Sequence, residues 1–186
     1  MRALAFTFLM LLPPAAAVAD ESAFTFPGDD MSSASRSGDL SASYRASDEG
    51  PLRFVVTEKE KEPEQEKEVA SFDFLRTVDG QWRDNALFVN NHIGSNTSDC
   101  LVLTKGEQAY GFTSVRSLLD RDGSIDKASD WIKPAQLAPN AEYHMICETW
   151  ESDNKIDVAI TGNTGIEAFK YHLRVDLSNG SFSFTK

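Results

Sequence analysis

The sequence has little of what marks most enzymes, nucleic-acid-binding proteins and membrane proteins. Of its 186 residues only two are cysteine and three are histidine, and 18 Lys and Arg stand against 29 Asp and Glu. It contains no phosphate-binding loop, no serine in a nucleophile-elbow pattern and no basic stripe interleaved with aromatics. We find no catalytic residue to name, which favours a non-enzymatic role and leaves an enzyme as the open alternative.

The shortage of basic residues gives the chain a formal net charge of −11. Phosphate backbones and anionic lipids repel an acidic protein, so we expect neither nucleic acid as a partner nor insertion into a membrane. Acidic surfaces suit solubility, cations or a basic protein surface. We therefore expect a protein partner, with a small ligand as the alternative.

Long hydrophobic runs are also missing, except near the start. Leu4–Leu12 is apolar, Arg2 places a positive charge before it, and Ala17–Ala19 supplies small residues before Asp20. This order is typical of a secretory signal peptide covering Met1–Ala19, and the apolar run is too short to span a bilayer. We expect export to the periplasm or to the extracellular space.

The two cysteines, Cys100 and Cys147, have no metal or redox motif around them. In an oxidising compartment such a pair is expected to form a structural disulfide. Closing a loop of about 47 residues would add about 4 kcal/mol to the free energy of unfolding on the chain-entropy model.

Composition changes before residue 69. From Asp20 the chain is rich in Ser, Ala, Asp and Gly, and Glu58–Glu68 is a run of charged and polar residues with Pro63 near its centre. Such a run buries no apolar surface, so we interpret residues 20–68 as an acidic low-complexity or disordered region and linker. Residues 69–186 are then one β-rich globular domain, long enough for a single core.

The last third of the chain alternates apolar and polar residues, the pattern of strands with one buried face. Four segments predict an antiparallel meander: Tyr143–Trp150, Lys155–Gly162, Glu167–Ser178 and Ser181–Lys186. With the strand-like segments before them, they predict a mainly β fold, either a small antiparallel β-barrel or a β-sandwich. One short helix, Asp126–Lys133, is expected in the insertion between the two cysteines.

Turn chemistry predicts the register of this meander. Asn179-Gly180 is typical of a two-residue hairpin loop, which would pair Leu177 with Phe182 and Val175 with Phe184. A four-residue loop at 163–166 would set Ile160, Val158 and Ile156 opposite Phe169, Tyr171 and Leu173. Another at 151–154 would set Met145, Cys147 and Thr149 beside Ile160, Val158 and Ile156.

A short apolar turn at Phe72–Leu75 leads into Asp79-Gly80-Gln81-Trp82 and then into a strand-like segment, Ala86–Ile93. This order is similar to the start of lipocalin-type barrels and of some bacterial protease-inhibitor barrels. The resemblance implies a small closed barrel with Trp82 plugging one end. It also implies the alternative function of carrying a small ligand.

Two groups of residues are candidates for a site on the meander and its insertion. The predicted register sets Glu148, Asp157, His172 and Arg174 together on the polar face of the sheet. A carboxylate beside an imidazole can serve acid–base chemistry, but paired charges across strands also simply stabilise a sheet. Trp131 and Trp150, near acidic residues, are candidates for a partner interface.

A weak calcium candidate surrounds Gly123, with oxygen donors at Asp120, Asp122, Ser124 and Asp126. The first and last ligand positions of a calcium loop would hold Leu118 and Ser129, so an ordinary Asp-Gly turn is the stronger interpretation. The three histidines match no zinc motif, and no cofactor is expected. Asn96-Thr97-Ser98 is a glycosylation acceptor only in a eukaryotic host.

These features together predict an exported, non-enzymatic binding domain, an inhibitor or an interaction module for a basic protein partner. The alternatives are a small-ligand carrier of the lipocalin type and a structural envelope or surface protein. A hydrolase built on Glu148, Asp157 and His172 is the enzymatic alternative.

Overall fold

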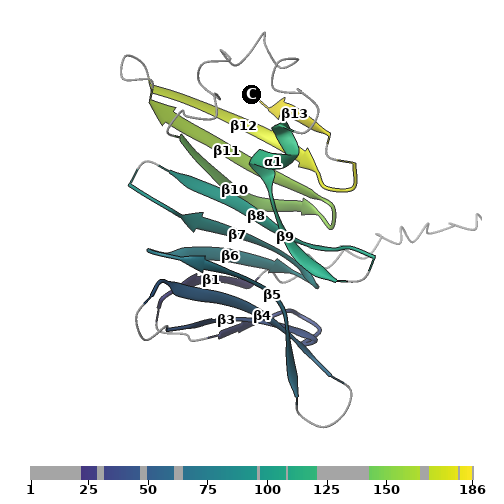
Figure 1. Ribbon diagram of the computed structural model, residues 1–186. Helices are drawn as coiled ribbons and strands as arrows, with labels where there is room; N and C mark the ends of the chain where they lie inside the picture. The colour runs from purple at the N-terminus through teal and green to yellow at the C-terminus, as the bar shows by residue number, and fades with distance from the viewer. Residues whose placement is uncertain are drawn as a thin grey trace, which may run out of the picture.

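The computed structural model describes residues 22–28, 32–46, 50–60, 65–95, 97–107, 109–120, 143–163, 168–179 and 181–185. These residues form two sheets and one short helix, so the fold is mainly β and sandwich-like (Figure 1). The predicted closed barrel is not formed by them, because the strands make two separate open sheets. The predicted signal peptide and the predicted helix Asp126–Lys133 lie outside the described residues.

The larger sheet has the strand order β1-β6-β7-β8-β10-β11-β12-β13, with β9 also paired to β8. The smaller sheet has the order β2-β3-β4-β5. Neighbouring strands are antiparallel, apart from one parallel bridge between Ser98 of β8 and His144 of β10. The elements are β1 Ser22–Phe26, β2 Ser32–Ala34, β3 Leu40–Arg45, β4 Leu52–Lys59, β5 Glu66–Phe74, β6 Val78–Arg83, β7 Ala86–His92, β8 Ser98–Lys105, β9 Tyr110–Ser114, α1 Val115–Asp120, β10 Tyr143–Ser152, β11 Lys155–Asn163, β12 Ala168–Asp176 and β13 Phe182–Thr185.

The smaller sheet is built from the segment that composition assigned to a linker. The expected domain start at Val69 falls inside β5, and Phe54, Val55 and Val56 of β4 are fully buried. The charged run was misleading because its described residues pair across the β4–β5 hairpin with opposite charges facing each other, Glu58 with Lys67 and Lys59 with Glu66. The folded part of the chain therefore begins at least as early as Ser22.

An aromatic core joins the smaller sheet to the β1–β6–β7–β8 half of the larger one. Phe54 stacks on Phe72 with ring centroids 5.0 Å apart and meets Phe112 edge-on at 5.8 Å. Trp82 lies in this core at 1% exposure, so it fills the space between two sheets instead of plugging a barrel end. Gly80 faces the same way, and a Cβ there would lie 2.6 Å from Phe24 Cζ, so only glycine leaves room for the ring.

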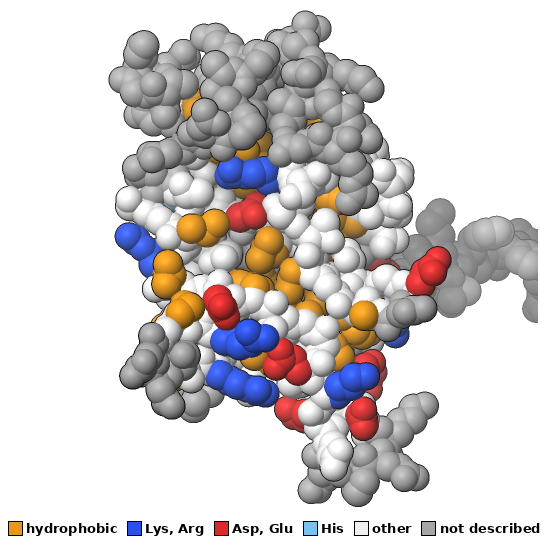
Figure 2. Space-filling view, in the orientation of Figure 1, with side chains coloured by type: hydrophobic (Ala, Val, Ile, Leu, Met, Phe, Trp, Pro, Cys, Tyr) orange, Lys and Arg blue, Asp and Glu red, His pale blue; other side chains and the backbone are white. Residues whose placement is uncertain are grey.

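The outer face of the smaller sheet carries charges of both signs. Arg53 lies 3.1 Å from Glu68 and 3.6 Å from Asp73, and Arg45 lies 3.7 Å from Glu68. Figure 2 shows acidic and basic side chains interleaved in this lower part of the view. Because these charges neutralise one another locally, this face is not where the excess acidity is concentrated.

A second core lies under the C-terminal meander. Met145, Val158, Ile160, Leu173 and Val175 are all buried there, which is the inner face that the alternation predicts. The predicted pairs of Met145 with Ile160 and of Cys147 with Val158 are confirmed. Among the described residues, no helix is long and apolar enough to cross a membrane.

The third predicted pair of β10 is wrong because the strand contains a bulge. The register shifts between Cys147 and Thr149, so Thr149 faces Asp157 and Trp150 faces Ile156. Glu148 is the extra residue. A bulge turns the following side chains to the opposite face, so Trp150 enters the core in place of Thr149.

The predicted pairings of β12 are each displaced by two residues. Ile160 faces Tyr171, and Phe169 faces Gly162, whose missing side chain leaves room for the phenylalanine ring. A shift of two keeps every side chain on its expected face, so the inner face is correct although the partners are not.

The pairing in the last hairpin also differs by two residues from the prediction. Phe182 faces Val175 in the structure, whereas the prediction placed it opposite Leu177. The Asp176 N–H donates to Ser181 O at 2.8 Å, and Leu177 N–H donates to Asn154 O at 2.7 Å. Asp176 Oδ1 accepts the Ser178 N–H, and Asn179 Oδ1 accepts the Ser181 N–H. These side-chain contacts stabilise a wider turn than the two-residue loop that Asn179-Gly180 suggests.

Candidate functional site

The predicted disulfide is present and joins β8 to β10. Cys100 and Cys147 are bonded, with their Cα atoms 5.6 Å apart and 47 positions apart in the chain. Both residues are buried, at 0% and 2% exposure. The disulfide matters locally because β8 and β10 otherwise share a single ladder bridge.

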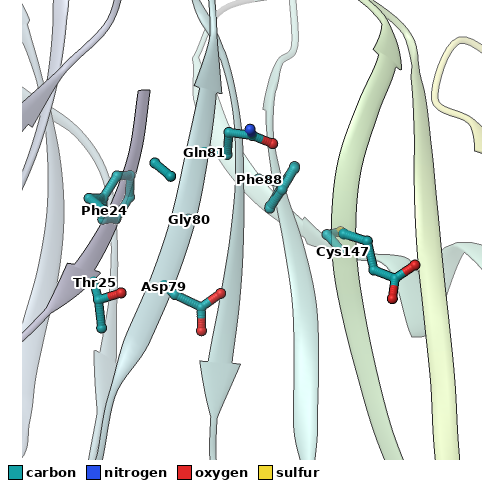
Figure 3. Close-up of a pocket in the computed structure, with 9 residues that line it drawn as sticks. Phe24, Thr25, Asp79, Gly80, Gln81, Phe88 and Cys147 are labelled. Carbon is teal, nitrogen blue, oxygen red and sulfur yellow. The ribbon is translucent and has the colours of Figure 1, made fainter. Parts of the chain in front are cut away.

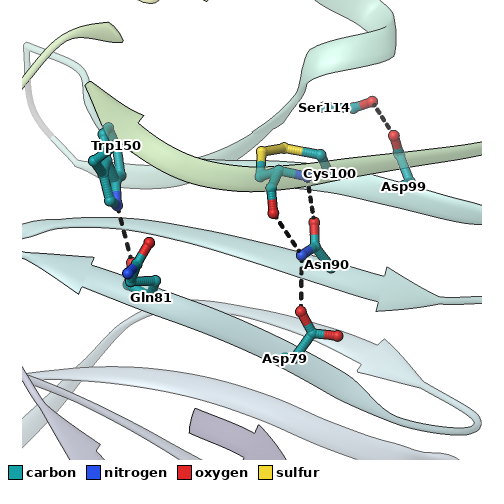
Figure 4. The surroundings of a disulfide bond; sticks show 8 residues. Asp79, Gln81, Asn90, Asp99, Cys100, Ser114 and Trp150 are labelled. Carbon is teal, nitrogen blue, oxygen red and sulfur yellow. Dashed lines mark hydrogen bonds between the residues drawn. A yellow bond between two sulfur atoms is a disulfide. The ribbon is translucent and has the colours of Figure 1, made fainter. Parts of the chain in front are cut away.

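Asn90 of β7 ties β10 to the sheet beside this disulfide. Its Nδ2 donates to Cys147 O at 3.0 Å, and its Oδ1 accepts the Cys147 N–H at 2.8 Å (Figure 4). The carboxamide thus makes the two hydrogen bonds that a neighbouring strand would make. Further along β10, the Trp150 indole N–H donates to Gln81 O of β6 at 3.2 Å. Strand β10 therefore crosses from the edge of β8, over β7, to β6.

Asn90 also holds an acidic side chain in place. Its Nδ2 donates to Asp79 Oδ2 at 2.8 Å, while Asp79 Oδ1 lies 2.5 Å from His92 Nε2. Because a carboxylate only accepts, His92 Nε2 carries a proton here. Both oxygens of Asp79 are therefore oriented by partners on β7.

Asp79 and His92 belong to a chain of four polar side chains that continues through Ser98 to His144. His92 Nδ1 lies 2.9 Å from Ser98 Oγ, and Ser98 Oγ lies 2.9 Å from His144 Nδ1. A hydroxyl can donate one hydrogen bond and accept another, so Ser98 Oγ can bridge the two imidazole nitrogens. Each side chain from Asp79 to His144 therefore has a hydrogen-bond partner in this chain of contacts.

The order of carboxylate, imidazole and hydroxyl resembles a Ser-His-Asp catalytic triad. The geometry, however, does not allow Ser98 to act as a nucleophile. Ser98 has 0% exposure, and its hydroxyl oxygen is enclosed by two imidazoles. A nucleophile has to reach a substrate carbonyl. The chain of side chains instead forms a satisfied polar network that fixes the position of Asp79.

A pocket of about 440 Å³ opens beside Asp79 (Figure 3). One wall is formed by β1 and β6, where Thr25 faces Asp79 and Ala23 faces Gln81 across the ladder. The other wall comes from β10 at Cys147 and Glu148, and Phe88 of β7 lies between them. The pocket therefore lies within the larger sheet, between the β1–β6 pair on one side and β10 on the other.

The predicted polar cluster of the meander divides into two groups. Glu148 Oε2 lies 3.1 Å from His172 Nδ1, which makes one carboxylate–imidazole pair. Arg174 instead pairs with Glu151 and, at 3.5 Å, with Asp157. Of these residues only Glu148 belongs to the pocket lining, and its carboxylate reaches across β11 to His172 of β12.

The other candidate residues do not form a site in the described part of the chain. Trp150 is 4% exposed and packs on Phe88, with ring centroids 5.6 Å apart, so it belongs to the core and not to an exposed interface. Trp131, Asp122, Ser124 and Asp126 lie outside the described residues, and Asp120 is the last residue of α1. No three His, Cys, Asp or Glu residues gather as metal ligands among those that the structure describes.

One further carboxyl group lies near the disulfide. Burial raises the pKa of Asp99 above its usual value of 3.8, although the hydrogen bond from Ser114 Oγ and the charge of Arg116 act to lower that pKa. The Ser114 Oγ donates to Asp99 Oδ1 at 3.0 Å (Figure 4). Asp99 lies on β8 away from the pocket lining, so we assign it no part in the site.

No protein-family model, no curated protein and no solved structure matches this chain. Its function therefore has to be inferred from the pocket, the charge of its lining and the cross-linked frame that holds it.

Proposed function

We propose that this chain is an exported, non-enzymatic binding module that captures a basic protein partner. The observation that carries the proposal is the pocket beneath β10, which places Asp79 and Glu148 in one lining. Of its lining residues that the structure describes, none is Lys or Arg. An acidic recess of this kind attracts and orients positive charge on a partner.

Export is supported by two independent features. The buried disulfide between Cys100 and Cys147 is typical of proteins from oxidising compartments, and the first 19 residues have the composition of a secretory signal peptide. The periplasm and the extracellular space both fit these features.

A binding role is favoured over catalysis by what the polar residues do. The buried Ser98 hydroxyl is not accessible to a substrate, and Asp79 is already held by His92 and Asn90. Both contacts leave Asp79 poised to accept further hydrogen bonds without requiring it to move. Such fixed acceptors favour recognition, because little ordering entropy is lost on binding.

The small-ligand alternative is favoured by one observation, the pocket volume of about 440 Å³. Small-molecule sites commonly span about 300–1,000 Å³. In this alternative the small ligand would lie in the open pocket beside β10. A lipocalin-like barrel would instead enclose its ligand in the barrel interior.

The proposal is tested by presenting the purified, disulfide-bonded chain to a panel of basic proteins and a matched panel of acidic proteins. The same chain is also presented to the exported protein fraction of its host. We expect it to retain basic proteins selectively from the panel and at least one basic protein from the exported fraction. Binding should weaken as salt rises, because exposed charges are screened. If the chain retains no basic protein, neither from the panel nor from the exported fraction, the proposal is contradicted.

A further inference from the structure

A single buried hydroxyl joins two imidazole rings at the junction of β8 and β10. Ser98 Oγ lies 2.9 Å from His92 Nδ1 and 2.9 Å from His144 Nδ1. Ser98 is 0% exposed, so solvent water cannot replace either ring as its hydrogen-bond partner. Ser98 and His144 also form the one ladder bridge between these two strands. The hydrogen bonds of this hydroxyl therefore contribute directly to the junction.

The hydroxyl limits how many protons the two rings can carry together. It has one hydrogen to donate, so it can donate to one ring nitrogen while it accepts the N–H of the other. If both Nδ1 atoms carry protons, the Ser98 oxygen accepts from both and its own hydrogen has no acceptor among the described residues. A buried polar hydrogen without a partner destabilises the fold. Because His92 Nε2 already carries a proton toward Asp79, a second proton on its Nδ1 makes His92 a cation.

The network is therefore satisfied when neither ring or one ring is charged, and it fails when both are. With His92 neutral, Ser98 donates to His92 and accepts from His144. With His92 charged, Ser98 accepts from His92 and donates to His144, which must then be neutral. Two positive rings on one oxygen would also repel each other in a site that water does not screen.

Neighbouring charges do not remove this restriction. Asp79 of β6 contacts His92 and favours a charge on that ring alone. Across β11, Thr161 lies opposite His144, and it carries no charge. The other charged groups on neighbouring elements make no hydrogen bond or ion pair with either ring among the described residues. They are Arg76 of the turn before β6, Asp99 of β8, Arg116 of α1, Glu148 of β10 and Lys170 of β12.

We propose that His92 and His144 form an acid-sensitive switch on the β8–β10 junction, because the native fold accommodates a positive charge on only one of them. In the unfolded chain each imidazole takes up a proton independently. The unfolded state then binds more protons, so stability falls as pH falls below about 6.5, the usual range for histidine. The disulfide keeps the two strands linked, so acid loosens the junction without separating them. Asp79, held by His92, carries the change to the pocket lining.

The charge on each ring is measured directly by imidazole ¹⁵N shifts of the disulfide-bonded full chain as pH is lowered. The chain has three histidines, and His172, which contacts Glu148 outside the network, is the internal reference. At about pH 5.5 we expect His172 and one of the other two rings to be cationic, while the remaining ring stays neutral. Charges on both His92 and His144 in the folded protein at that pH would overturn the inference.

The decisive variant is His144→Asn, because asparagine places an amide near the position of Nδ1 and takes up no proton. Between about pH 7 and pH 5, the unfolding equilibrium constant of the unaltered chain should rise about tenfold more than that of the variant. One proton bound only by the unfolded state changes this constant up to about tenfold per pH unit. A comparison between two pH values does not depend on how far the substitution itself destabilises the fold.

His172→Asn is the matched control, because it removes a histidine outside the network. It should keep at least the full acid response of the unaltered chain. The raised pKa of Asp99 acts in the opposite sense, and it does so equally in all three chains. A merely structural role of His144 would lower stability at both pH values alike. An equal acid response of His144→Asn and the unaltered chain would therefore overturn the inference.

Discussion

Replacing Asn90 by leucine tests whether a single carboxamide holds β10 across the larger sheet. Asn90 is 1% exposed and makes three hydrogen bonds, two to the backbone of Cys147 and one to Asp79. Leucine has a similar size but no polar atoms. The Cys147 N–H and C=O, in a residue that is 2% exposed, would lose these partners inside the protein.

The expected cost follows from those two backbone groups. Each buried polar group left without a partner costs about 1–3 kcal/mol, so Asn90→Leu should lower the free energy of unfolding by about 2–5 kcal/mol after the gain in apolar burial. Because domains of this size are commonly stable by about 5–15 kcal/mol, the variant should still fold. Chemical denaturation followed by circular dichroism measures the change.

Asn91 provides the matched control one residue further along the same strand. Its Oδ1 is buried without a hydrogen-bond partner among the described residues. Asn91→Leu removes that unsatisfied atom and should change stability by no more than about 1 kcal/mol in either direction. If Asn90→Leu and Asn91→Leu cost the same, the hydrogen bonds of Asn90 do not stabilise the crossing and this reasoning is refuted.

Three further predictions concern the frame around the pocket. Replacing both cysteines by serine should lower the free energy of unfolding by about 4 kcal/mol, measured by denaturation, and an unchanged midpoint would contradict the cross-linking role of the disulfide. Gly80→Ala should lower the free energy of unfolding by about 1–3 kcal/mol, because the new Cβ would lie 2.6 Å from Phe24 Cζ and 2.7 Å from Phe88 O. As a control, Gly111→Ala should leave the free energy of unfolding nearly unchanged, because a Cβ there meets nothing within 4 Å. Asp99→Asn should raise stability at neutral pH and leave it unchanged in acid, because a buried carboxyl with a raised pKa destabilises the fold as pH rises above 3.8. Equal effects at both pH values would contradict that sign.

Much of the meander could be predicted from its alternation alone. Apolar residues at every second position identify the buried face, and the disulfide was predicted from two cysteines in a chain whose first 19 residues have the composition expected of a signal peptide. The exact pairing could not be read from the turns. Asp176 and Asn179 accept backbone N–H groups through their side chains and widen the last hairpin, which no count of loop residues reveals.

The first half of the fold was harder to predict for a different reason. In β3 and β4 the buried positions include Ala42 and Thr57, and the charged residues of β4 and β5 stabilise a hairpin by facing each other. Such a segment has the composition of a linker because its apolar residues are few. They are nevertheless buried against a second sheet, which only the pairing of distant strands creates.

The candidate site shows the same limit. Glu148 and His172 were predicted to be neighbours because both lie on the meander, where local register is readable. Asp79, His92, Ser98 and His144 come from four strands, and nothing in their spacing signals that β10 crosses over β7. A polar residue at an inward position, as at Asn90, was the one available signal of a buried network in this part of the chain.

The most direct test of the account maps where a basic partner binds on the intact protein. Backbone amide shifts would be recorded by heteronuclear NMR while a basic protein retained from the panel is added to the disulfide-bonded chain. We predict that the amides of Thr25, Asp79, Gln81 and Glu148 move together and saturate with one Kd. Shifts confined to the outer face of β3–β5, with these four amides unchanged, would contradict the claim that the pocket beneath β10 is the binding site.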